Sequence, residues 1–190
     1  MKSKKFPIVI LTVLVIIGFI IGFFAGGYNR LVKAQTNVET KQADIQTQLQ
    51  RRADLIPNFV ATVKGYTKYE QETLTAVTQA RASVSKATNA ESLSQASDQL
   101  DKAISVWVNA VTEAYPELKA NSNYIALQDE LAGTENRIAV ARKDYNEAVQ
   151  SYNTMIKTFP KNILAGMFNF EKAAFFTASD EAQTVPNVEF

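Results

Sequence analysis

The sequence predicts an all-α protein: a single N-terminal transmembrane helix, then a long antiparallel (up-down) four-helix bundle and an irregular C-terminal tail. Three observations support this prediction. The first is that residues 6–25 form an apolar run without a charged residue. Second, apolar residues recur at steps of three and four over residues 28–158, which is the period of amphipathic helices. Third, only two prolines and two glycines interrupt residues 28–158, which leaves few turns of the kind a sheet needs.

The apolar run at residues 6–25 is long enough to be a membrane helix, because twenty residues rise about 30 Å. The alternative is a cleavable signal, whose apolar core is usually shorter. Three lysines precede the run, while only Arg30 and Lys33 follow it closely. This bias predicts a cytoplasmic N-terminus and a bundle outside the cell membrane, with residues 1–27 as the anchor.

Gly18, Gly22 and Gly26 recur every fourth residue and therefore share one stripe of the membrane helix. Small residues on one stripe let a second helix approach closely, so the stripe is a candidate site of helix association. The alternative is that glycine is simply frequent in membrane helices.

The bundle is predicted to occupy residues 28–159, with helices near residues 28–51, 55–86, 91–113 and 122–158. Thr88 or Asn89 is expected to cap the third helix, and the residue before Pro116 to end it. Apolar steps also run through Pro57 with little interruption, so one long kinked helix is an alternative to a turn there. The stripes expected to face the core in the first and third helices are Leu31, Val38, Ile45 and Leu49, and Leu93, Leu100, Ile104, Trp107 and Val111.

Two turns, at residues 51–58 and 115–122, are expected at the end of the bundle far from the membrane. Arginines there are suited to clamp a carboxylate or phosphate. We favour a structural interpretation, in which the arginines suit a helix C-terminus and an aspartate caps the next helix. Ion pairs between helices are likewise expected for Glu135, Arg137 and Arg142. The candidate partner-binding residues of the tip are Arg51, Arg52, Asp54, Pro57, Tyr115 and Pro116.

The tail, residues 160–190, is rich in aromatic residues and is expected to return toward the bilayer. It can either enter the membrane interface or fold back over the open end of the bundle. The candidate membrane-interface residues are Phe168, Phe170, Phe175 and Phe176.

The composition excludes or disfavours several classes of function. The 190 residues carry 20 Lys+Arg and 19 Asp+Glu, a net charge of +1, so no nucleic-acid partner is expected. The absence of Cys and His excludes disulfides, thiol nucleophiles, Cys/His zinc sites and a histidine base. Di-iron bundle sites need histidine and no calcium-loop pattern occurs, so we predict no metal and no cofactor. Nothing converges on a catalytic base, and we predict that the protein is not an enzyme.

Several motifs in order make the chain similar to the LemA family. They are Tyr28-Asn29, Gln50-Arg51-Arg52-Ala53-Asp54-Leu55-Ile56-Pro57-Asn58, Tyr115-Pro116-Glu117-Leu118-Lys119-Ala120, Thr134-Glu135-Asn136-Arg137-Ile138, Tyr145-Asn146, Tyr152-Asn153 and Phe159-Pro160. The resemblance implies a membrane-anchored helical bundle of the bacterial envelope, without an agreed biochemical activity. Some relatives carry a lipid-bearing cysteine just before the Tyr-Asn pair; Gly27 stands there in this chain, so the apolar run has to be the anchor.

Two hypotheses of function follow from these features and the resemblance. The first is a non-enzymatic, single-pass scaffold that forms homo-oligomers and organises or shapes the lipid bilayer. The second is an adaptor whose distal tip binds a membrane protease or another envelope protein.

Overall fold

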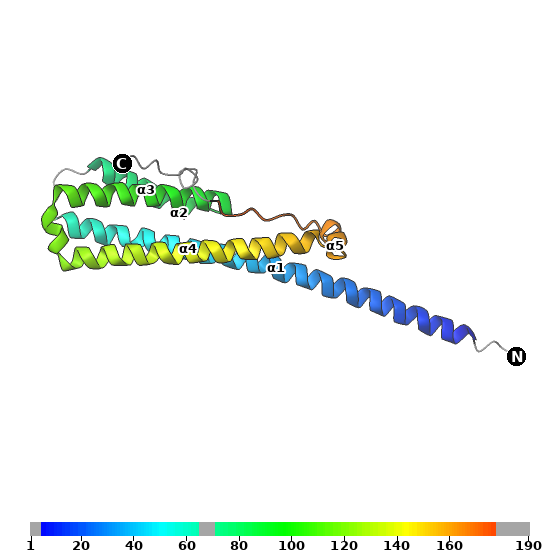
Figure 1. Cartoon of the computed structure of the whole chain (residues 1–190). Coiled ribbons are helices and arrows are strands. Elements are labelled where there is room, and N and C mark those ends of the chain that lie inside the picture. The colour runs from blue at the N-terminus through cyan, green and yellow to red at the C-terminus, as the bar shows by residue number, and fades with distance from the viewer. Residues whose placement is uncertain (1–4, 65–70, 178–190) are drawn as a thin grey trace, which may run out of the picture. The chain divides into compact units, whose positions relative to one another are not determined.

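The computed structural model describes residues 5–64 and 71–177, and all regular secondary structure in these two ranges is helical (Figure 1). This confirms the all-α class. Lys2, Lys4 and the end of the tail from residue 178 lie outside the described residues. The helices are α1 (Lys5–Lys64), α2 (Gln71–Lys86), α3 (Ala90–Ala114), the short 3₁₀ helix η1 (Pro116–Ala120), α4 (Ser122–Lys157) and α5 (Lys161–Met167).

Helix α1 runs for 60 residues and passes through Pro57, so the predicted turn at residues 51–58 is wrong and the continuous-helix alternative is correct. Proline in a helix interior removes one backbone hydrogen bond. The helix continues because both neighbours of the proline on the inner face are buried: Ile56 and Phe59 are 4% and 0% exposed. Apolar burial on either side outweighs the local preference for a break.

Local signals set the ends of α3 as predicted. The Ser92 N–H donates to Asn89 Oδ1 at 2.8 Å and the Asn89 N–H donates to Ser92 Oγ at 3.1 Å, a reciprocal capping box. Tyr115, held in a non-helical conformation by the following Pro116, ends the helix.

Helix α5 was not expected, because the tail was predicted to be irregular. It ends in a Schellman motif: the Phe170 N–H donates to the Ala165 carbonyl at 2.9 Å across Asn169, whose φ of 55° is left-handed. Asparagine tolerates this conformation better than most residues. The chain then continues through residues 168–177 without helix.

The described residues divide into two compact units. The first unit comprises residues 5–39 and 148–173, and the second comprises residues 40–64, 71–147 and 174–177. Helices α1 and α4 contribute to both units. Buried side chains of the first unit are Leu31, Val38, Ala148, Val149, Tyr152, Ile156, Leu164 and Ala165.

The core of the second unit is aromatic where α1, α3 and α4 meet. The Phe59 ring lies 4.9 Å from the Trp107 ring and 5.1 Å from the Tyr124 ring, between centroids. The Tyr124 and Thr112 hydroxyls share a 2.6 Å hydrogen bond. Helices α2 and α3 lie side by side (Figure 1). The apolar stripes predicted for the first and third helices are buried, from Leu31 to Leu49 and from Leu93 to Val111.

Candidate functional site

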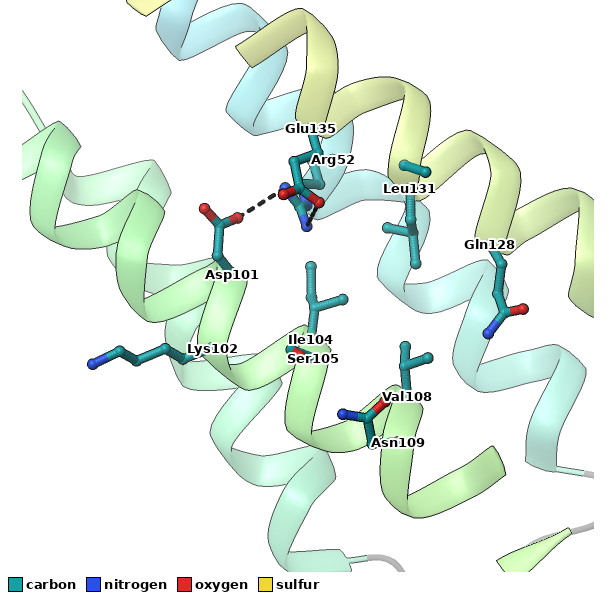
Figure 2. Close-up of a pocket in the computed structure, with 11 residues that line it drawn as sticks. Arg52, Asp101, Lys102, Ile104, Ser105, Val108, Asn109, Gln128, Leu131 and Glu135 are labelled. Carbon is teal, nitrogen blue, oxygen red and sulfur yellow. Dashed lines mark ion pairs between the residues drawn. The ribbon is translucent and has the colours of Figure 1, made fainter. Parts of the chain in front are cut away.

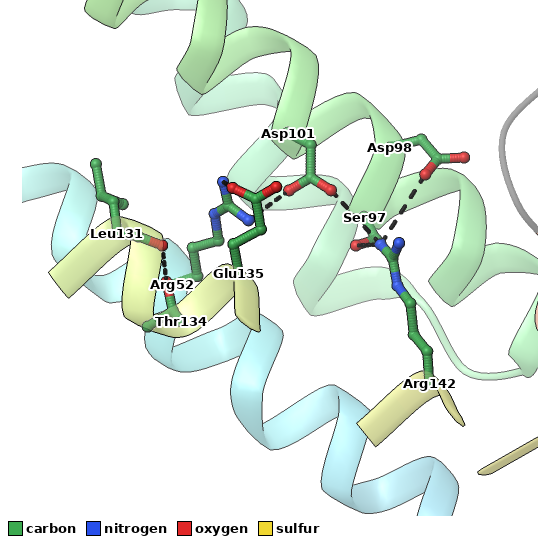
Figure 3. A network of polar contacts seen from close by, with 8 residues as sticks. All are labelled: Arg52, Ser97, Asp98, Asp101, Leu131, Thr134, Glu135 and Arg142. Carbon is green, nitrogen blue, oxygen red and sulfur yellow. Dashed lines mark hydrogen bonds and ion pairs between the residues drawn. The ribbon is translucent and has the colours of Figure 1, made fainter. Parts of the chain in front are cut away.

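A buried ionic network joins three helices of the second unit (Figure 3). Its centre is Arg52 on α1, which is only 4% exposed. Arg52 Nη1 lies 2.8 Å from Asp101 Oδ1 on α3, and Arg52 Nη2 lies 3.6 Å from Glu135 Oε2 on α4. A buried guanidinium needs such partners, because taking an unpaired charge out of water is very unfavourable.

Arg142 on α4 extends the network from the other side of Asp101. Its Nη2 lies 3.5 Å from Asp101 Oδ2 and 4.0 Å from Asp98 Oδ1, and it donates a hydrogen bond to Ser97 Oγ. The guanidinium carbon also lies 4.9 Å from the centroid of the Phe176 ring, within the range of a cation–π contact. Asp101 therefore bridges two arginines. The ion pairs between helices predicted for Glu135 and Arg142 are confirmed. The prediction is wrong for Arg137, which pairs at 2.7 Å with Glu130 of its own helix, α4.

Burial raises the pKa of Asp101 above its ordinary 3.8, against the opposing attraction of Arg52 and Arg142. The folded state therefore holds the Asp101 proton more tightly than the unfolded state does. The contribution of this group to stability is full below about pH 3.8 and falls as the pH rises through the folded pKa. Ionisation of Asp101 in the fold thus carries a desolvation penalty that its two arginines do not fully offset.

An open cavity of about 470 Å³ adjoins this network in the second unit (Figure 2). Ile104, Val108 and Leu131 contribute apolar wall, and Asn109 and Gln128 contribute amides. The formal charges of the lining balance, because it contains two basic residues, Arg52 and Lys102, and two acidic residues, Asp101 and Glu135. The Arg52 guanidinium already has two carboxylate partners. The geometry therefore favours a structural network over an anion site.

The predicted tip residues lie in two separate places. Arg51 pairs with Glu130 at 2.9 Å and Asp54 pairs with Arg81 at 3.3 Å, both within the helical body of the second unit. Pro57 is exposed in the α1 interior. Tyr115 lies fourteen residues beyond Asp101, the partner of Arg52, which is a rise of about 21 Å along a helix. The turn that was to bring the six residues together is absent from α1, and their role in partner binding stays a prediction.

The segment after α5 is held by two Tyr-Asn pairs of α4. In the first unit, the Tyr152 hydroxyl donates to the Glu171 carbonyl at 2.8 Å, and the Asn153 amide exchanges two hydrogen bonds with the Ala173 backbone at 2.9 and 3.0 Å. In the second unit, the Tyr145 hydroxyl donates to the Ala174 carbonyl at 2.8 Å. The Asn146 amide exchanges two hydrogen bonds with the Phe176 backbone, at 3.0 and 2.9 Å.

We call these hydrogen bonds, from the Tyr-Asn pairs at 145–146 and 152–153 to the backbone of residues 171–176, the clamp. The clamp shows why part of the aromatic tail is not available for contact with a membrane. Phe176 is only 5% exposed, whereas Phe168 and Phe175 are about half exposed. The two Tyr-Asn pairs are seven residues apart in the sequence, and the backbone groups that they bind in the structure are three residues apart. Seven helical residues and three extended residues both span about 10 Å.

We expect Asn146→Ala to release the segment around Phe176 while α4 stays folded. The variant removes both hydrogen bonds to the Phe176 backbone, and each contributes about 1 kcal/mol. Hydrogen exchange of the Phe176 amide should accelerate by about ten-fold or more, while exchange of the Ala173 amide stays unchanged. Asn153→Ala is the matched control: exchange of the Ala173 amide should accelerate, and exchange of the Phe176 amide should stay unchanged. Equal acceleration at both amides in both variants would contradict the clamp.

In the first unit, the N-terminal part of α1 is uncharged over residues 6–25, and its described side chains are exposed. Side chains from Ile10 to Phe24 are exposed, and in the described residues α1 is the one helix long and apolar enough to cross a membrane. A Cβ added at Gly18, Gly22 or Gly26 would meet nothing within 4 Å, so this glycine stripe is open. A Cβ at Gly27 would instead clash with the Leu164 side chain of α5.

No group of three or more Asp, Glu, His or Cys side chains that could hold a metal occurs in the described part of the chain.

Comparison with known proteins gives consistent matches. A model of the LemA family matches residues 41–190. Protein LemA of Metamycoplasma hominis is 29% identical over 178 residues, which cover 93% of this chain and 80% of that protein. Magnetosome protein MamQ 2 of Paramagnetospirillum magneticum is 24% identical over 96% of this chain and 76% of its own length. Magnetosome protein MamQ of Magnetospirillum gryphiswaldense is 21% identical over 78% of this chain and 64% of its own length.

Proposed function

Because the chain belongs to the LemA family, we propose that it is a non-enzymatic, single-pass membrane protein that self-associates and organises the bilayer. Its N-terminus is cytoplasmic, and the helices of the second unit form an up-down four-helix bundle outside the membrane. Relatives named as magnetosome proteins support a role at membranes.

The observation that carries the proposal is the open glycine stripe. Gly18, Gly22 and Gly26 lie on an exposed apolar segment, and a Cβ added at any of them would lie more than 4 Å from the side chains and neighbouring elements that the structure describes. In lipid there is no hydrophobic force between helices, so close packing at small residues drives their association. The stripe is the place on this helix where a second backbone approaches most closely.

We expect Gly22→Leu to weaken self-association in the membrane, because the added side chain separates the two backbones. The measurement is energy transfer between donor-labelled and acceptor-labelled full-length chains in lipid vesicles. The matched control is Ile21→Leu, which alters the neighbouring position and keeps its volume. Unchanged transfer in Gly22→Leu, or equal loss in both variants, would remove the stripe as the association surface.

An adaptor that binds a membrane protease or another envelope protein is the second candidate. It rests on a distal tip formed by two turns, at residues 51–58 and 115–122, of which the first lies inside the continuous helix α1. Arg51 and Arg52 are instead engaged by Glu130, Asp101 and Glu135, which weighs against that role.

A further inference from the structure

We propose that residues 159–168, named here the α5 foot, rest in the lipid interface and that the groove beside the foot is filled by acyl chains of membrane lipids. The proposal rests on membrane insertion of α1, which is part of the proposed function. It adds a second, lipid-binding contact that neither the glycine stripe nor the membrane helix supplies.

The foot presents large apolar side chains to the outside. Phe159, Ile163 and Met167 are 76%, 52% and 60% exposed, and they are four residues apart in the sequence. Leu164 and Ala165 of the same helix are buried within the first unit. A seven-residue helix that is apolar on both faces needs two apolar environments. The protein supplies one of them.

The position of the foot identifies the second environment as lipid. An open groove of about 420 Å³ is lined by Phe168 and Tyr28 together with Ile20, Ile21 and Phe24 of the apolar run. Ile20 lies five residues inside the end of that run at Ala25, which is a depth of about 7.5 Å. Interfacial helices bury their apolar face by about 5–10 Å. The groove therefore places Phe168 at the depth of an interfacial side chain.

Contacts within the first unit hold the foot at this level. The Tyr28 ring lies 4.8 Å from the Phe168 ring and 5.8 Å from the Phe170 ring, between centroids. Leu164 packs where the absent side chain of Gly27 leaves room. Tyrosine at the end of a membrane helix is typical of the interface, with its ring in the lipid and its hydroxyl near water.

The excess of basic residues in the first unit is suited to contact with a lipid surface. The first unit beyond the apolar run contains five basic residues against two acidic residues, Glu39 and Glu171. Long basic side chains place their stems on apolar surface and their charges at the headgroups, so anionic lipids should strengthen the contact. The basic residues are Arg30, Lys33, Lys157, Lys161 and Lys172.

Spin labels on single cysteines test the proposal, because the chain has no native cysteine. The full-length chain is labelled at Ile163→Cys or Met167→Cys and placed in vesicles of equal parts phosphatidylcholine and phosphatidylglycerol. Accessibility is measured to oxygen, which enters lipid, and to a water-soluble nickel chelate. Leu14→Cys in the apolar run and Ser151→Cys on α4 serve as the lipid and water references; both positions are exposed, as are the two test positions.

We expect the labels at 163 and 167 to lose access to nickel and to gain access to oxygen, toward the values at position 14. If both match position 151 while position 14 is in lipid, the foot proposal is wrong and membrane insertion stands. If position 14 also matches position 151, membrane insertion itself is wrong. Loss of access to both reagents, with spectral broadening from spin–spin interaction between labels on two chains, would mean that a second copy covers the foot. That result would overturn the lipid assignment.

A second measurement probes the groove. Phe168→Trp adds a fluorophore to a chain whose other tryptophan, Trp107, is buried in the second unit and provides the wild-type background. Lipids with brominated acyl chains should quench the added fluorescence. No quenching beyond that of the wild type would show that acyl chains do not enter the groove.

Discussion

Asp101→Ala is expected to lower the free energy of unfolding of the second unit by about 3–5 kcal/mol. The aspartate bridges Arg52 and Arg142, and its loss leaves a guanidinium that is 4% exposed with a single partner, Glu135, at 3.6 Å. Arginine does not release its proton to escape this penalty. Urea unfolding followed by the fluorescence of Trp107, the single tryptophan, measures the change.

Replacing the pair by apolar residues should behave differently. Burial raises the pKa of Asp101 despite the attraction of Arg52 and Arg142, so the two arginines do not fully offset the desolvation of its carboxylate. The double variant Arg52→Met with Asp101→Leu should therefore recover most of the stability that Asp101→Ala loses. Asp129→Ala, on an exposed position of α4, is the control and should stay within about 0.5 kcal/mol of the wild type. An unchanged stability in Asp101→Ala would contradict the structural role of the network.

Pro57→Ala is expected to raise the free energy of unfolding by about 1–3 kcal/mol. Proline in a helix interior is about 3 kcal/mol less favourable than alanine, and its exposed ring at position 57 contributes little to the core. The alanine N–H regains the hydrogen bond to the carbonyl four residues earlier. The same urea experiment measures the gain.

The sign of the change in stability in Pro57→Ala distinguishes a turn at residues 51–58 from a continuous helix α1. In a turn, proline restricts the unfolded chain, and its replacement would lower stability by about 0.4–1 kcal/mol. A decrease would therefore contradict a continuous α1. Asn58→Ala, the adjacent exposed position, is the control for a simple gain in helix propensity.

Elements with local signals could be predicted from the sequence. The limits of α3 follow from Asn89 and Pro116, whose effects extend over only a few residues. The end of α4 at Lys157 likewise precedes Pro160. The buried stripe of α3 was predictable because the apolar period of a helix is a property of the sequence alone.

Elements that depend on tertiary contacts could not be predicted in this way. At Pro57 the proline favours a break while the apolar steps at Ile56 and Phe59 favour a continuous helix, and the sequence alone does not decide between them. In the structure both apolar residues are buried and α1 continues. Helix α5 begins at Lys161, and its N-cap residue, Pro160, makes no side-chain hydrogen bond, so no capping signal marks its start. Hydrogen bonds from Tyr145 and Asn146 reach backbone about thirty residues away, and a repeated Tyr-Asn pair alone does not identify that partner.

We propose that this protein of the LemA family assembles in the membrane through its N-terminal helix. The most direct test is the native mass of the full-length chain in nanodiscs, beside a chain that starts at Tyr28. We expect a defined oligomer for the full-length chain and a monomer for the shortened one. A full-length chain that is monomeric in the bilayer would contradict the proposal.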